Sequence, residues 1–500
     1  MKGHPAADLT ELPRAVAHRW ALRLAALLLA LCVPLAGCTA RHPPPAAPAT
    51  SAGPATAPPV QARADPLGVK WDWPRTDRYS PFLRELSGGA TFYELVWCNV
   101  EPTRGRRDWS RVDEVAQATR QLGYALLLKL RVGSCWATGG RRGKERGVRR
   151  TTASAMPLRL DDYQAFVRAA VQRYAALGVH TWSIENEIDA PAFFWAGTPE
   201  EYERLATAVA AAIRSADPRA SVFDSGLASP VYGVAIAARL LAEGRGGDAV
   251  AAYQRYYAQR HQAPAAAFPP VADVTGLRSV LAGEEARRAL DCLAVTQRLA
   301  RRRVVDGYQL HFYESWDNVP ALLAYLHDTL PPSFPIQAWE VGAFWPGGPA
   351  DQATLAAAVT KTVTGLLAGG VRRVIWLPLS YDPARRQDGE LRFGLLDPDG
   401  DVRPAGSAFR SVAAAARGAA WRGVSGGGIS GVAFGRGGAT TLVLWSDTGA
   451  TLRGSLKPGS KATGITGEPL RLGSAGLRLG PQPVLLTMPV GLAEAVRIVP

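Results

Sequence analysis

Cysteine is scarce in this sequence, with five in 500 residues, and methionine is scarcer still, with three. No pair among Cys98, Cys135 and Cys292 has the spacing of metal ligands, which argues against a zinc or iron–sulfur site. The net charge of +14 comes without zinc-finger spacing, an RNP-like aromatic motif or a long basic helix. Because charge alone is a weak signal, we expect no nucleic-acid partner.

Long apolar runs are also missing, apart from one near the N-terminus. Arg19 and Arg23 precede an apolar segment that starts at Ala25 and is too short for a stable membrane span. It ends in Leu-Ala-Gly-Cys38, which resembles the lipobox of bacterial lipoproteins. We expect residues 1–37 to be a lipoprotein signal peptide and Cys38 to carry the lipid. A plain secretory signal is the alternative, and both place the protein outside the cytoplasm, at a bacterial cell surface or in the periplasm.

The segment from 38 to 66 is rich in Pro, Ala and Thr and has almost no bulky apolar residue. Such a stretch cannot bury enough surface to fold, so we expect a disordered tether between the membrane anchor and a globular body.

Cys98 and Cys135 each end a predicted strand, and these strands would be neighbours. A disulfide and two buried free thiols are equally compatible with the sequence.

From residue 67 onward, short β-like runs alternate with amphipathic helical segments, which predicts an α/β protein. The continuous apolar run at 124–132 is typical of a strand covered on both faces. Thr198 and Glu201 form the capping-box pattern of a helix start. Eight β/α units in succession favour a TIM (β/α)8 barrel over an open sheet. The predicted strands lie at 67–73, 90–97, 124–132, 179–187, 220–226, 306–313, 334–342 and 371–379.

Two regions depart from the simple repeat. The stretch from about 230 to 300 is long and mainly helical, which indicates a crossover enlarged by an insertion. Beyond residue 420 the pattern changes to short alternating strands with glycine turns. We therefore predict a barrel domain over 67–418 and a small, sandwich-like all-β domain over 419–500.

Chemically active side chains cluster at the predicted strand ends. Active sites of TIM barrels lie at the C-terminal ends of the strands. Glu187 ends the fourth strand, His311 and Tyr313 end the sixth, and Glu340 ends the seventh. Tryptophans also fall at this rim, where indole faces can stack on sugar rings: Trp97, Trp136 and Trp376. Solvated acids at strand ends are the simpler alternative for the two glutamates.

The chain resembles glycoside hydrolase clan A, and within it the family 39 and family 5 type enzymes, over about residues 67–417. WSIENE, HFY and WEVG on strands four, six and seven carry the likeness, with WCNVEPTRGRRDW at 97–109 and FGLLDPDGDVRPAGSAF at 393–409. The resemblance implies a retaining double displacement. Glu187 would be the general acid/base, Glu340 the nucleophile, and Asn186 a ligand of the sugar 2-hydroxyl. Tyr313 would hydrogen-bond Glu340, and His311 would orient its neighbours.

The sequence departs from the clan pattern in three places. Glu185 stands where an aromatic residue is common, and we expect it to support the site or to contact a sugar hydroxyl. Ile188, rather than proline, follows the acid/base. The second strand lacks the arginine that usually supports the nucleophile, and we expect Lys129 or Arg131 on the third strand to replace it.

The loop at 139–150 carries six basic residues against one acid. Either it binds an anionic glycan, such as a uronate polymer, or it is a solvated loop in an arginine-rich chain. We expect a monomer that acts on an oligo- or polysaccharide and needs no metal or organic cofactor. The rival functions are a transglycosidase or exopolysaccharide-processing enzyme with the same site, and a non-catalytic glycan-binding lipoprotein.

Overall fold

The computed structural model describes residues 60–61, 65–139, 153–262, 268–343, 351–380, 394–452, 456–473 and 476–499. Residues 1–54 and 55–500 are separate units, and every described residue belongs to the second. The predicted signal peptide, the lipid site at Cys38, most of the tether and the basic loop from residue 140 onward lie outside the described residues. Among the helices that are described, none is both long and apolar enough to cross a bilayer.

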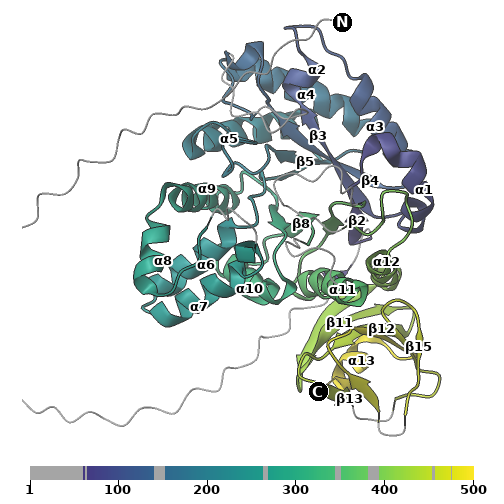
Figure 1. Cartoon of the computed structure of the whole chain (residues 1–500). Helices are drawn as coiled ribbons and strands as arrows, with labels where there is room; N and C mark the ends of the chain where they lie inside the picture. Colours follow the sequence, from purple (N-terminus) through teal and green to yellow (C-terminus); the bar gives the residue numbers. More distant parts are fainter. Residues whose placement is uncertain are drawn as a thin grey trace, which may run out of the picture. The chain divides into compact units, whose positions relative to one another are not determined.

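Eight parallel strands form the barrel predicted from the sequence (Figure 1). They are arranged as two four-stranded sheets, in the orders β3-β4-β5-β6 and β2-β9-β8-β7. The sheets meet at a bridge between Phe223 and Gly307, and again where Gly68 passes Ala90. A Cβ at position 68 would lie 1.9 Å from the Ala90 carbonyl oxygen, so only glycine allows this approach. The strands are β2 (Leu67–Val69), β3 (Ala90–Val96), β4 (Ala125–Arg131), β5 (Thr181–Ile184), β6 (Ser221–Phe223), β7 (Tyr308–Phe312), β8 (Ile336–Val341) and β9 (Val374–Trp376).

Helices follow the strands and cover the outside of the barrel. The capping box predicted at Thr198 is present. The Thr198 hydroxyl accepts a hydrogen bond from the Glu201 amide, and the Glu201 carboxylate accepts one from the Thr198 amide. In the described residues, the expected insertion between β6 and β7 contains the α-helices α6 (Val231–Ala242), α7 (Gly246–Tyr257), α8 (Val274–Leu281) and α9 (Glu284–Arg301). The others are α1 (Thr76–Glu85), α2 (Trp97–Val100), α3 (Ser110–Gln121), α4 (Leu160–Ala175), α5 (Pro199–Ala216), α10 (Val319–Thr329), α11 (Gln352–Ala368) and α12 (Pro404–Ala416).

Alternation along the strands separates two hydrophobic cores. In β9, Ile375 packs inside the barrel, while Val374 and Trp376 join the core between barrel and helices. The inner cluster also contains Phe92, which lies below the polar strand ends. Because the barrel interior is filled with side chains, a ligand can reach only its rim. The inner cluster consists of Ala90, Phe92, Leu127, Phe223, Trp339 and Ile375.

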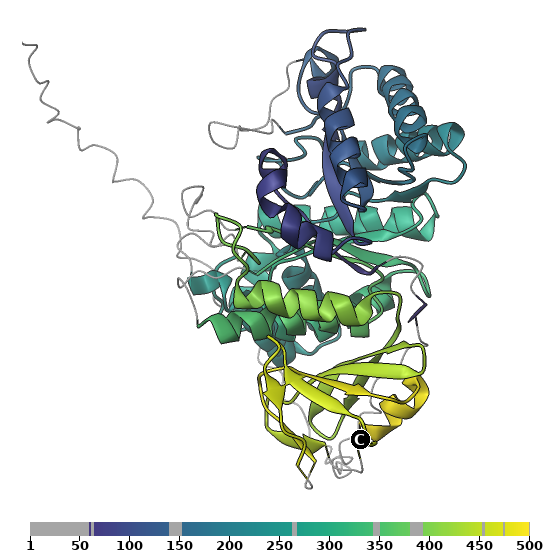
Figure 2. The ribbon, with the colours of Figure 1, turned by 90° about the vertical axis from the view of Figure 1, so that its right-hand side faces the viewer.

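The C-terminal region is an antiparallel sheet, drawn in light green to yellow in Figure 2. It packs against α11. One face joins the barrel core through Val432 and Val443, and the other carries Ala433 and Leu442 in a separate core. The seven-stranded order is β1-β10-β11-β12-β17-β14-β15, and β13 pairs with β16. These strands are β10 (Ala420–Gly426), β11 (Ile429–Arg436), β12 (Ala439–Trp445), β13 (Ala450–Leu452), β14 (Lys461–Gly464), β15 (Pro469–Leu470), β16 (Leu477–Leu479) and β17 (Val484–Met488), followed by helix α13 (Leu492–Ile498).

Two local features go beyond the sequence prediction. Strand β1 (Val60–Gln61) lies within the predicted tether, yet it pairs with Ala420 and Trp421 of β10. The prediction of a wholly disordered tether is therefore wrong for these two residues.

Cys98 and Cys135 form a disulfide, with their Cα atoms 5.6 Å apart, whereas Cys292 is a buried free thiol.

Candidate active site

A buried lysine lies at the centre of the polar strand ends. The Lys129 side chain, on β4, is 0% exposed. Its Nζ donates to Glu340 Oε1 at 2.5 Å and to Asn186 Oδ1 at 2.6 Å. The ammonium also lies 4.4 Å from the centre of the Phe92 ring, a cation–π distance. Of the two basic residues expected to support Glu340, Lys129 is the one that contacts it. Arg131 instead lies 2.6 Å from Glu94 and 3.6 Å from Glu185.

A β-bulge turns Glu340 toward this lysine. In β8, the register with β7 shifts between Leu310 and His311, which leaves Trp339 as the extra residue. Trp339 packs inside the barrel against Phe223, and Glu340 reaches the rim. Such bulges re-aim side chains beside active sites. Glu340 also accepts a hydrogen bond from the Tyr313 hydroxyl through Oε2 at 3.0 Å, the contact that the resemblance implied.

His311 connects the two glutamates. Its Nδ1 is 3.0 Å from Glu187 Oε1, and its Nε2 is 3.3 Å from Lys129 Nζ and 3.7 Å from Glu340 Oε1. An ammonium can only donate, so Nε2 accepts and Nδ1–H donates to Glu187. Gly226 makes room for this ring, since a Cβ there would lie 2.4 Å from Nε2, and its φ of +65° suits glycine.

The stretch Glu185–Asn186–Glu187 does not continue the strand. β5 ends at Ile184, and both glutamates have left-handed backbones, with φ of 65° and 38°. Such non-glycine conformations are strained and cluster at functional sites. Regular strand alternation would place both glutamates on one face, but here the two have different surroundings. Glu187 is 14% exposed and faces His311, whereas Glu185 is fully buried and accepts from the Val132 amide at 2.7 Å.

Burial decides what Glu185 can do. Desolvation raises its pKa to about 7, and nearby Arg131 only partly opposes this effect. Its oxygens face Arg131 and Val132 rather than the rim. Of the two roles expected for Glu185, the structure supports a supporting role beneath the site, and not a sugar contact.

Glu187, His311 and Glu340 bring three potential ligand atoms within 4.8 Å of one another. Such a trio is compatible with a metal ion, but the Lys129 ammonium already lies against Glu340 Oε1 and supplies the positive charge there. Two carboxylates at about this separation can act on one carbon atom, because one can attack the carbon while the other transfers a proton. The usual separation is roughly 5–5.5 Å for retaining sugar chemistry and roughly 6.5–9.5 Å for inverting chemistry.

The three tryptophans do not gather at this centre. Trp97 is 1% exposed and stacks on Tyr163, and Trp376 is 0% exposed with its ring edge toward Phe409 of α12. This placement differs from the predicted sugar contacts, because both rings are buried. Trp136 is partly exposed and, with Trp97, Arg104 and residues near 158–162, lines a separate cavity of about 140 Å³.

Two residues near the site were missed by the sequence analysis. Arg288 of α9 donates to the carbonyls of Ile188, Trp195 and Gly197 at 2.8–3.1 Å, and so fixes the loop after Glu187. Its position inside a helical insertion gave no signal of this role. Asp189 follows the Glu187 motif, and its pKa is raised to about 7 by burial and by the charge of Glu187. An acid two residues after the motif was a signal that could have been used.

Comparison with known proteins places the barrel among solved structures. A family 39 glycoside hydrolase from Bacteroides cellulosilyticus WH2 shares 17% identity, with a TM-score of 0.57 over 85% of this chain and 81% of that one. A family 39 β-xylosidase from Caulobacter crescentus shares 14%, with 0.51 over 87% and 98%. A family 30 endoxylanase from Clostridium papyrosolvens C71 shares 12%, with 0.51 over 86% and 97%. No protein-family model and no curated protein matches the sequence. At these identities the likeness confirms the predicted fold.

Proposed function

We propose that the chain is a retaining glycoside hydrolase, which cleaves O-glycosidic bonds of an extracellular or cell-surface polysaccharide. The observation that carries this proposal is the pair Glu187 and Glu340, since one carboxylate oxygen of each lies within 4.8 Å of the other and of a His311 ring nitrogen. The fold shared with family 39 and family 30 glycoside hydrolases supports it. The words β-xylosidase and endoxylanase describe those two neighbours and do not assign a sugar to this chain.

The geometry gives each carboxyl group one part of a double displacement. Glu340, beside the Lys129 ammonium and the Tyr313 hydroxyl, is held as the carboxylate that attacks the anomeric carbon. Glu187 receives the His311 N–H on Oε1, which leaves Oε2 to carry the proton for the departing oxygen. Cleavage of the glycosidic bond then leaves a glycosyl ester on Glu340. Glu187, now ionised, takes a proton from water as that water attacks the ester and releases Glu340.

Asn186 completes the arrangement. Its Oδ1 accepts from Lys129, so the amide NH₂ group is left to donate to a hydroxyl of the sugar. Hydrogen bonds to the 2-hydroxyl strengthen in the transition state of such reactions. The proposal includes a lipid anchor at Cys38, which would hold the enzyme outside the cytoplasm on a bacterial membrane.

A hydrolysis screen on a panel of glycans tests this function. The fragment should begin at Ala55 rather than at residue 67, because Val60–Gln61 pairs with β10. We expect turnover with retention at the anomeric carbon, seen by proton NMR of the first product. Glu340→Gln should abolish turnover. Glu187→Gln should spare substrates with a 4-nitrophenyl leaving group, and azide should speed its second step because azide needs no base.

The control is Glu243→Gln, which changes an exposed glutamate at the end of α6. This variant should keep the wild-type rate. Products longer than the substrate would indicate a transglycosidase with the same site. Binding of glycans without turnover in the wild type would contradict the hydrolase and favour a glycan-binding protein.

A further inference from the structure

Lys70 follows strand β2 at the rim of the barrel, near the proposed nucleophile Glu340. In β2, Leu67 and Val69 pack outward into the core beneath the helices. The strand period of two therefore directs Gly68 and Lys70 toward the barrel interior. The backbone of Lys70 is held by β9, since its amide donates to the Trp376 carbonyl and its carbonyl accepts from the Leu379 amide. Lys70 thus belongs to the same ring of strand ends as Lys129 and Glu340.

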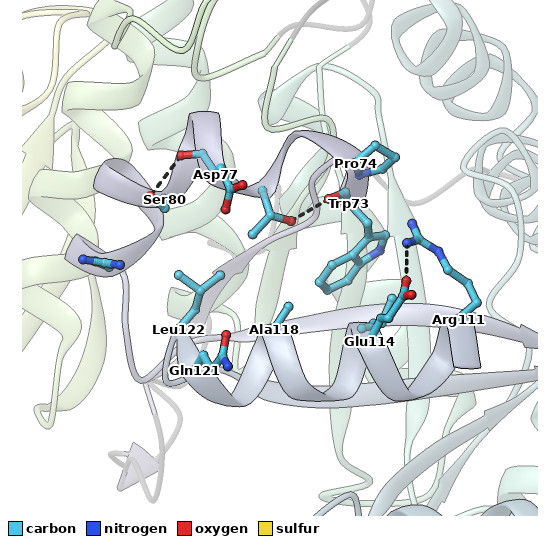
Figure 3. Close-up of a pocket in the computed structure, with 12 residues that line it drawn as sticks. Trp73, Pro74, Asp77, Ser80, Arg111, Glu114, Ala118, Gln121 and Leu122 are labelled. Carbon is cyan, nitrogen blue, oxygen red and sulfur yellow. Dashed lines mark hydrogen bonds and ion pairs between the residues drawn. The ribbon is translucent and has the colours of Figure 1, made fainter. Parts of the chain in front are cut away.

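Aromatic rings surround the Lys70 ammonium. Its Nζ lies 4.9 Å from the ring centre of Trp73, 5.5 Å from that of Phe92 and 5.8 Å from that of Tyr93. Lys129 lies over the same Phe92 ring, so the two lysines share one aromatic residue. Trp73 is itself wedged over α3, beside a cavity of about 330 Å³ between that helix and α1 (Figure 3).

The ammonium has an incomplete set of partners among the described residues. Its one hydrogen bond within that part of the chain is to the carbonyl of its neighbour Trp71, at 3.4 Å. Over the same residues, no carboxylate lies within 4.0 Å of it. The acidic groups whose charges act on Lys70 also pair with other residues: Glu94 with Arg131 at 2.6 Å, Glu340 with Lys129 at 2.5 Å, and Asp72 with Arg75 at 3.8 Å.

The Lys70 ammonium is partly buried, so the free energy of its charge depends on what lies beside it. Burial lowers the pKa of Lys70 to about 8, while the negative charges of Glu94, Glu340 and Asp72 oppose that shift. Lys70 is therefore mostly protonated at neutral pH. A sugar that displaces water from the rim would leave the ammonium desolvated, which is costly unless an anion replaces the water.

We propose that Lys70 binds the carboxylate of an acidic sugar at the catalytic site, so that the substrate is a uronic-acid-containing glycan. This inference rests on the proposed hydrolase function and assigns its substrate class. The aromatic rings favour this arrangement, because they stabilise the cation without neutralising it.

The test compares matched pairs of 4-nitrophenyl glycosides, each a uronide and the neutral hexoside that differs from it only at C6. In the pair that the purified full chain cleaves fastest, the uronide should have the higher kcat/KM. Lys70→Met should lower kcat/KM for the uronide by about 10- to 100-fold, the effect of losing one charged hydrogen bond. The neutral partner should change by less than about threefold. Lys457→Met removes an exposed lysine of the C-terminal domain and should leave the ratio unchanged.

Faster cleavage of the neutral hexosides, or an equal loss on both partners in Lys70→Met, would overturn the proposal. If no glycoside is cleaved, the hydrolase function fails, and calorimetry with D-glucuronate, D-galacturonate and the matching neutral sugars still tests Lys70. Uronate binding that Lys70→Met removes supports the assignment. Uronate binding that is absent, or that Lys70→Met does not weaken, overturns it.

Discussion

Replacing Lys129 with methionine tests whether a buried ammonium keeps the proposed nucleophile ionised. Lys129 is fully buried and lies 2.5 Å from Glu340 and 2.6 Å from Asn186. Methionine fills most of the same volume and removes the charge. The Tyr313 hydroxyl remains on Glu340. Breaking a buried ion pair costs about 3–5 kcal/mol, because the remaining charge stays desolvated.

That cost sets the size of the effect. About 3 kcal/mol corresponds to roughly a 100-fold change in an equilibrium or rate. We expect kcat/KM at neutral pH to fall by at least about this factor. The assay is kcat/KM between pH 4 and 9 on the best substrate of the glycan screen.

A second variant separates chemistry from folding. Lys129→Met should lower the free energy of unfolding in urea, and adding Glu340→Gln should restore part of it, because the buried charge is then gone. A Lys129→Met variant that keeps its rate within about threefold of wild type across this pH range would contradict a role of the ammonium in catalysis. A stability loss that Glu340→Gln leaves unchanged would also count against the pairing.

Three other features of the structure lead to predictions of their own. The Cys98–Cys135 disulfide joins residues 37 positions apart, and reducing it should lower the free energy of unfolding by about 4 kcal/mol. The thermal midpoint should fall as well, and an unchanged midpoint would contradict this. Arg288→Met should lower kcat by about tenfold with little change in KM, because the charged hydrogen bonds that position the loop after Glu187 are lost. A change in KM alone would contradict a positioning role. Glu185, whose pKa is raised from 4.5 to about 7, holds a proton in the folded chain that the unfolded chain has released, so stability should fall as pH rises through this window. Glu185→Gln should flatten that dependence in urea unfolding at pH 5 and pH 7.5, and an unchanged slope would show that Glu185 does not cause it.

Much of the barrel could be predicted because its signals are local. Each predicted strand contains one observed strand, from β2 at Leu67–Val69 to β9 at Val374–Trp376. Apolar periodicity and the Thr198 capping box depend only on residues close in sequence. The connection order then fixes which strand ends share one rim, so the order of the strands was enough to place Glu187 and Glu340 together.

Other features depend on departures from regular geometry. The left-handed backbones at Glu185 and Glu187 end β5 early and send the two side chains to different places. The bulge at Trp339 turns Glu340 toward Lys129. Neither departure has a signature in the sequence, because each is stabilised by contacts with distant strands. For the same reason, a strand position alone could not show that Trp376 faces Phe409 rather than the rim.

The (β/α)8 order, the pair Glu187 and Glu340, and Asn186 beside Glu187 can therefore be read from the amino-acid sequence, since they follow from periodicity and strand ends. The folded chain was needed to show that Lys129, not Arg131, contacts Glu340, that Cys98 and Cys135 pair, and that Lys70 lies at the rim among aromatic rings. The reason is that the partners of a side chain across a barrel depend on which strand residues come together in space. Strand twist and β-bulges set these contacts between residues far apart in the sequence, which no local sequence pattern records.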